Sequence, residues 1–147
     1  MTLTYGLRTP RDLFEKLMRD AALLNDEVTS DRFFNFVLTG YSIIDWLKHE
    51  PSVSAGDVQS MYKNPWIRVC GELANASKHF KLDKQSTAVA DTQRHQGWGR
   101  GRYGKGGWGV GEQQITLSLS DGSSIDCLEF VKRVIAVWEA FFLSHRL

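Results

Sequence analysis

A short stretch of the chain spaces four polar side chains so that a helix would align them. From Arg68 they follow at intervals of +4, +3 and +4, as Glu72, Asn75 and His79. At about 100° per residue these side chains point within about 60° of one another. A histidine near a carboxylate can act as general acid or base near neutral pH, and an arginine can hold a phosphate. These four residues, the polar seam, are therefore either one wall of a polar site or an ordinary solvated face.

A second pair of polar residues, Asp45 and His49, ends the most apolar segment of the chain, one helical turn apart. If that end meets the polar seam, both would join Glu72 and His79 in one cluster. Such a cluster would suit a metal, but no His-x-x-x-His pair supports one. Solvation of Asp45 and His49 at a helix end is the alternative. We expect no metal and no other cofactor.

A glycine-rich segment from Gln96 to Gly111 carries a third set of candidate residues. No acidic residue occurs between Thr92 and Gly111, whereas arginine, lysine and aromatic residues alternate. Flexible backbone, guanidinium groups and aromatic faces together suit single-stranded nucleic acid, and they equally suit a protein interface. A hairpin that packs its aromatic rings on its own helices or on a neighbouring subunit is the alternative. The candidate binding residues are Trp98, Arg100, Arg102, Tyr103, Lys105 and Trp108, together with Lys78, Glu72 and Asp45.

Five helices are expected to position these residues. Thr9, Ser54 and Asn64 are typical N-cap residues, and proline occupies the first helical position after two of them. Apolar residues then recur at helical spacing, and one segment is apolar almost all round, which is typical of a central helix. The predicted helices span about 10–25, 30–49, 54–62, 64–82 and 125–145.

One strand is expected on each side of the glycine-rich segment. Residues 114–120 alternate between apolar and polar as a half-buried strand does, residues 85–92 tolerate a strand, and Asp121-Gly122 is a turn signal. The predicted fold class is mainly α: a four- to five-helix bundle, residues 1–147, with one β-hairpin at about 85–120 inserted before the last helix.

Composition narrows the class of protein. The 147 residues are enough for one domain with a proper core, and the net charge of +1 lacks the strong positive field of a general duplex-DNA binder. No apolar run approaches 18 residues and no signal peptide is recognisable, so we expect a cytoplasmic protein without a membrane span. Cys70 and Cys127 fall in apolar helical patterns and are interpreted as reduced core residues.

Two elements of the chain resemble a group of small uncharacterised bacterial and phage-associated proteins. Tyr41-Ser-Ile-Ile-Asp45-Trp46 resembles their Tyr-His-x-x-Asp-Trp element, with Ser42 in place of the histidine. Leu73-Ala-Asn-Ala-Ser-Lys-His79-Phe80 resembles their Leu-Ala-Asn-x-x-Lys-His-Phe element. A glycine-rich middle and a Trp-containing last helix extend the resemblance over most of the chain.

A looser similarity is to HEPN domains, helical bundles of toxin–antitoxin and phage-defence systems whose ribonuclease members use an Arg-x(4–6)-His motif. Asn75 and His79 match the second half of that motif, Ala74 occupies the arginine's place, and Arg68 lies eleven residues before His79. The resemblance implies a non-enzymatic, HEPN-like relative that binds a protein or single-stranded RNA and pairs as a homodimer. The alternative is a metal-independent ribonuclease, with His79 as acid or base, Asn75 orienting the substrate and Arg68 on the phosphate.

Overall fold

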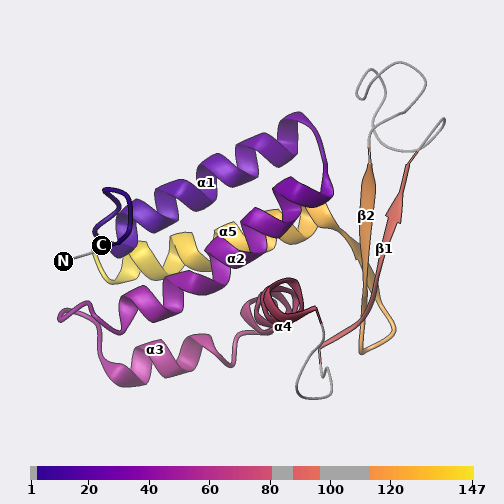
Figure 1. Ribbon diagram of the computed structural model, residues 1–147. Coiled ribbons are helices and arrows are strands. Elements are labelled where there is room, and N and C mark those ends of the chain that lie inside the picture. The colour runs from indigo at the N-terminus through magenta and orange to yellow at the C-terminus, as the bar shows by residue number, and fades with distance from the viewer. Residues whose placement is uncertain (1–2, 81–87, 97–112) are drawn as a thin grey trace.

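The computed structural model describes residues 3–80, 88–96 and 113–147 and is mainly helical (Figure 1). Within these ranges, five helices are joined by a small antiparallel sheet of three strands, so the predicted mainly α class is confirmed. The elements are α1 (Pro10–Asp26), α2 (Ser30–Leu47), α3 (Ala55–Met61), α4 (Pro65–His79), β1 (Val89–His95), β2 (Gln114–Leu119), β3 (Ser124–Asp126) and α5 (Cys127–Ser144).

The three predicted N-caps are confirmed. The Thr9 side chain accepts a hydrogen bond from the Asp12 amide, and the Asp12 carboxylate accepts one from the Thr9 amide, which completes a capping box. Asn64 caps α4 through its side-chain oxygen. Ser54 accepts from the Asp57 amide. Each cap satisfies amide groups that the first helical turn leaves without a partner.

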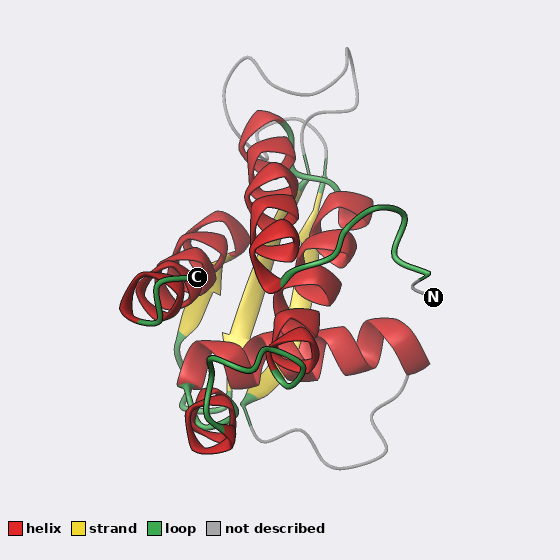
Figure 2. Cartoon of the chain, turned by 90° about the vertical axis from the view of Figure 1, so that its left-hand side faces the viewer, coloured by secondary structure: helices red, strands yellow, loops and turns green. Residues whose placement is uncertain are grey.

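The helices and the sheet share one hydrophobic core. α1 packs on α2 and α5, and α2 packs on α4. In Figure 1 the sheet stands across one end of α1, α2 and α5, and in Figure 2 the strands lie behind the helices. Trp138 of α5 is fully buried at the centre, where its indole N–H donates to the carbonyl of Gly40 at 3.0 Å. A buried indole N–H needs such a partner, so this bond fixes α5 against α2.

Two helical glycines let α2 and α4 approach closely. A Cβ on Gly71 would lie 2.4 Å from Cε1 of Tyr41, and a Cβ on Gly40 would lie 3.2 Å from Sγ of Cys70. The Cys70 thiol donates to the carbonyl of Val37 at 3.4 Å in the same contact. The position of α4 against α2, and therefore of the polar seam on α4, depends on the absence of a side chain at Gly40 and at Gly71.

The sheet has the order β1-β2-β3, which makes β1 an edge strand. In the register, Thr92 lies opposite Leu117 and Arg94 lies opposite Ile115. Opposite residues of an antiparallel pair point to the same face, and both β2 residues are buried. Thr92 and Arg94 therefore point to the helix side of the sheet, yet both are exposed. At these positions β1 overhangs the helices.

Two predicted helix boundaries were wrong. The fourth helix ends at His79 instead of continuing to Leu82, and Phe80, the next residue, is 88% exposed with a φ of 66°. The last helix begins at Cys127, because Ser124–Asp126 pairs with β2 as a third strand. Residues 85–87 of the first predicted strand lie outside the described residues, and β1 runs on to His95.

Within the described ranges, none of the helices combines the length and the apolar character that crossing a bilayer requires.

Candidate functional site

The polar seam lies on one unbroken helix, as its spacing predicts. Arg68, Asn75 and His79 are exposed, and Glu72 is half-buried. The buried side of α4 is formed instead by Ile67, Val69, Cys70, Gly71 and Ala74. Three of the four predicted site residues therefore face outward from the core, and Glu72 is the exception.

Glu72 fastens α4 to the beginning of β1. Its carboxylate accepts hydrogen bonds from the amide of Ala88, at 3.0 Å to each oxygen, and from the amide of Val89 at 2.8 Å. Hydrogen bonds from neutral donors to an ionised acceptor are stronger than those between neutral groups. The carboxylate is thus used to position a strand, and this role is structural.

Asp45 lies at the C-terminal end of α2 and pairs with Lys48 at 2.8 Å. The carboxylate and the hydroxyl of Tyr62 raise the pKa of the Lys48 ammonium, which also lies over the Tyr62 ring at 5.5 Å. His49 is exposed beside them. Asp45 thus forms an ion pair with Lys48, and within the described ranges no group of three potential metal ligands includes it.

The glycine-rich candidates cannot be placed. Lys78 lies in the last turn of α4 and is exposed. The other six binding candidates lie outside the described residues: Trp98, Arg100, Arg102, Tyr103, Lys105 and Trp108.

A groove of about 520 Å³ opens between α2, α4 and β1, next to the polar seam. We call it the β1 groove. Its helix side presents Phe34 from α2 and Leu73, Ala76 and Ser77 from α4. Phe34 is 43% exposed, although α2 is otherwise a largely buried helix. The remaining lining residues are Ser30, Phe33, Val37, Glu72, Val89, Ala90, Asp91, Thr92, Gln93, Arg94 and Ile115.

The strand side of the β1 groove is the overhanging part of the sheet. Thr92 and Arg94 face the groove from above an apolar floor, and β1 pairs, among the described strands, with β2 alone. No ion pair joins Arg94 to another residue of the described chain. The groove thus combines an apolar floor, an exposed cation and a strand edge. The sequence did not indicate this groove, because a segment that is apolar almost all round was interpreted as a central helix, and an exposed Phe34 was not expected on it.

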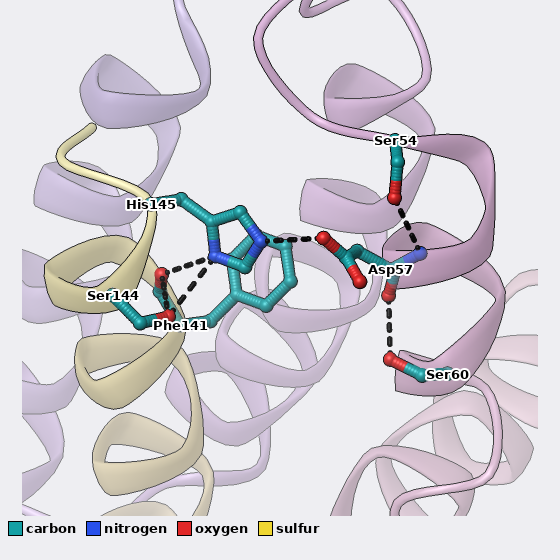
Figure 3. Close-up of polar contacts among 6 residues, drawn as sticks. All are labelled: Ser54, Asp57, Ser60, Phe141, Ser144 and His145. Carbon is teal, nitrogen blue, oxygen red and sulfur yellow. Dashed lines mark hydrogen bonds and ion pairs between the residues drawn. The ribbon is translucent and has the colours of Figure 1, made fainter.

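A polar contact between α3 and α5 was also missed (Figure 3). Nε2 of His145 lies 3.0 Å from Oδ2 of Asp57, and Nδ1 lies 2.9 Å from the carbonyl of Phe141, whose ring stacks on the imidazole. Both ring nitrogens face acceptors, which favours the imidazolium. The Asp57 carboxylate, and next the Phe141 carbonyl, raise the pKa of His145, and His145 in turn lowers the pKa of Asp57.

This contact differs from a hydrolytic triad, although Ser144 Oγ lies 3.1 Å from Nδ1. The Ser144 hydroxyl donates to the Phe141 carbonyl, and Nδ1 faces the same carbonyl. A general base needs a free nitrogen lone pair directed at the nucleophile. The Asp57–His145 pair therefore joins two helices, and sequence spacing gave no sign of it because 88 residues separate the partners.

The two cysteines of the chain lie in the core. Cys70 and Cys127 form no disulfide and are buried, as predicted, and burial raises the pKa of Cys70 to about 12. Such a thiol is a core residue and a poor nucleophile. Within residues 3–80, 88–96 and 113–147, no three His, Cys, Asp or Glu side chains are grouped as metal ligands.

Comparisons of the chain with protein-family models, with curated proteins and with solved structures found no match.

Proposed function

We propose that the chain is a non-catalytic, HEPN-like helical-bundle domain that binds an extended segment of a partner protein in the β1 groove. The segment adds to β1 along the edge that pairs with no other described strand, and its inward side chains cover the apolar floor. A host-defence or phage setting, which the sequence resemblance implies, belongs to the same proposal.

The observation that carries this proposal is the overhang of β1 above Phe34. An exposed strand edge supplies backbone donors and acceptors for an added strand, and pockets beneath it select alternate side chains. Phe34, Leu73 and Ala76 provide such a pocket floor. A half-exposed phenylalanine in a groove is also a common anchor for a partner, because covering it removes apolar surface from water.

The charge at the groove specifies the partner's chemistry. Arg94 points to the helix side of the sheet, and the residue opposite it on β2 is the buried, apolar Ile115. An acidic side chain on the added strand, directly opposite Arg94, would complete an ion pair of the kind that cross-strand neighbours form. We therefore expect a segment in which every second residue points into the groove. These inward residues should be apolar, except for one Asp or Glu opposite Arg94.

The state of the polar seam favours binding over catalysis. Glu72 already accepts hydrogen bonds from two backbone amides, whereas Asn75 and His79 are exposed at the end of α4. A general acid or base acts within a water-excluding site that also holds the substrate. Asn75 and His79 are exposed to water and lack such a site, whereas the β1 groove has the apolar floor that a docking surface needs.

A displayed library of random linear peptides tests the proposal. The library is selected on the wild-type chain and counter-selected on Phe34→Glu, which places a carboxylate on the apolar floor. We expect enriched peptides with alternating apolar residues and an acid. A synthetic copy should lose affinity by about tenfold or more with Phe34→Glu, because one buried anchor contributes about that much. Arg94→Glu should shift selection toward basic peptides.

Leu23→Glu on α1 is the matched control, because Leu23 is 49% exposed and lies outside the groove. Peptides that bind the wild type, Phe34→Glu and Leu23→Glu equally would contradict the proposal. Binding of single-stranded RNA without peptide binding would favour the nucleic-acid interpretation, and EDTA-resistant cleavage lost in His79→Ala would establish the ribonuclease.

A further inference from the structure

A second groove, of about 340 Å³, runs between α1 and α5 and shares no lining residue with the β1 groove. Most of its lining is small or apolar, and Met18 on its α1 side is 47% exposed. The lining residues are Met18, Ala21, Ala22, Asn25, Val131, Lys132, Ile135, Ala136 and Glu139.

The α5 side of this groove belongs to a longer surface stripe. At spacings of mostly three and four residues along α5, exposed and half-buried positions carry apolar and charged side chains, and a helix places such positions on one face. Leu143 at the far end is 78% exposed. Fifteen residues of helix separate the two ends, or about 22 Å. The α5 stripe consists of Leu128, Lys132, Ile135, Ala136, Glu139 and Leu143.

The α5 stripe is self-complementary when two copies of the helix are laid antiparallel. Around a point between Ile135 and Ala136, Lys132 on one side mirrors Glu139 on the other, and Leu128 mirrors Leu143. Two such helices laid antiparallel would place lysine against glutamate twice and leucine against leucine twice. A twofold axis requires this self-complementary pattern, because each copy presents the same surface to the other.

The two charged residues of the stripe have no ion-pair partner in the described part of their own chain, although their neighbour Arg133 pairs with Glu129 at 3.2 Å. Exposed charges beside an apolar groove are the arrangement that fixes the register of a helix pair. α1 flanks the groove with Met18 and Ala22, of which the smaller leaves room for an approaching side chain.

We propose that the groove between α1 and α5 binds a second copy of this chain. The α5 helices pack antiparallel about a twofold axis between Ile135 and Ala136, and Lys132 of each copy pairs with Glu139 of the other. Ile135 of each copy enters the groove beside Ala22 of the other. The resulting interface is helical and isologous, and it leaves β1 outside it.

Charge exchange tests this arrangement with the full-length chain in sedimentation equilibrium at low salt. Lys132→Glu alone sets glutamate against glutamate at both pairs, and Glu139→Lys alone sets lysine against lysine. Each should raise the dimer dissociation constant by about tenfold, since like charges face each other across an interface. Mixing the two variants places glutamates of one copy against lysines of the other, so the mixture should associate more strongly than either variant alone.

Lys63→Glu, a charge reversal at an exposed position outside both grooves, is the matched control and should leave association unchanged. The proposal is overturned if the wild type stays monomeric across the concentration range. It is also overturned if a dimer forms whose dissociation constant ignores both reversals, or if the mixture associates no more strongly than its components. Circular dichroism of each variant verifies that the helices remain folded.

Discussion

Glu72 on α4 and Asp57 on α3 are two carboxylates that each tie a helix to a distant segment, and they do so with different chemistry. Glu72 accepts from backbone amides of the residues that begin β1, and such donors carry their protons at any ordinary pH. Asp57 instead contacts Nε2 of the His145 imidazole, and the two form an ion pair only while the imidazole is protonated. The first carboxylate is half-buried, whereas the second is 56% exposed. The α4–β1 contact should therefore be the stronger and the less sensitive to pH.

The largest loss of stability is expected at Gly71, because this glycine allows α4, which carries Glu72, to pack closely on α2. With Gly71→Ala, the new Cβ would meet the Tyr41 ring at 2.4 Å, and the ring or the helix must move. We expect a loss of about 1–3 kcal/mol in the free energy of unfolding, measured in urea, despite the better helix propensity of alanine.

Gly56→Ala in α3 is the control, because the nearest atom to its Cβ would be 3.9 Å away. There alanine should stabilise by up to about 1 kcal/mol. If both substitutions had the same effect, the close approach of α4 to Tyr41 would not be what fixes the helix.

Removing the first carboxylate should have the next largest effect. Glu72→Ala leaves the amides of Ala88 and Val89 without this acceptor, so we expect a loss of about 1–2 kcal/mol in the free energy of unfolding. Hydrogen exchange at both amides should accelerate more than exchange within α5. Unchanged exchange at Ala88 and Val89 would show that other groups hold the beginning of β1.

The second carboxylate should reveal itself through pH. Because the pKa of His145 is raised, its contribution is complete below the ordinary value near 6.5 and is lost as pH rises through the raised value. Because the pKa of Asp57 is lowered, its contribution is complete above about 3.8 and is lost as pH falls through the lowered value. The pair therefore stabilises the protein most between about pH 4 and 6.5.

The measurement is the difference in melting temperature between the wild type and His145→Gln. We expect it to be larger at about pH 6 than at about pH 8.5, and smaller at either pH than the effect of Glu72→Ala. A difference that does not change with pH would mean that His145 acts through its stacking on Phe141 alone.

The smallest effects should come from the rest of the polar seam. Asn75→Ala and His79→Gln change exposed side chains at the end of α4, and each should alter the free energy of unfolding by less than about 0.5 kcal/mol. A large loss of stability in either variant would show that the seam contacts something that the described residues do not include.

Local features of the chain could be predicted from sequence because their causes are local. Thr9, Ser54 and Asn64 cap the helices that follow them, and the alternation of Gln114–Leu119 produces a strand. The end of α4 was overestimated because the periodicity continues past the point where Phe80 turns the backbone to a positive φ. The short strand Ser124–Asp126 was missed because three residues carry too little pattern, and its pairing with β2 forms it.

The candidate site depended on contacts that spacing does not encode. Helical spacing aligned Arg68, Glu72, Asn75 and His79 correctly, but it did not indicate that Glu72 would receive amides sixteen and seventeen residues further on. Asp57 and His145 gave no signal at all, because tertiary packing brings them together. Helical periodicity shows which side chains share a face, whereas their partners follow from how the helices pack.

The buried thiol of Cys70 has a practical consequence. It donates to the Val37 carbonyl, and its pKa of about 12 leaves almost no thiolate at neutral pH. An alkylating reagent such as iodoacetamide can therefore modify this sulfur only after α4 separates from α2. The rate of alkylation in the native protein would report how often that separation occurs, without any label being introduced.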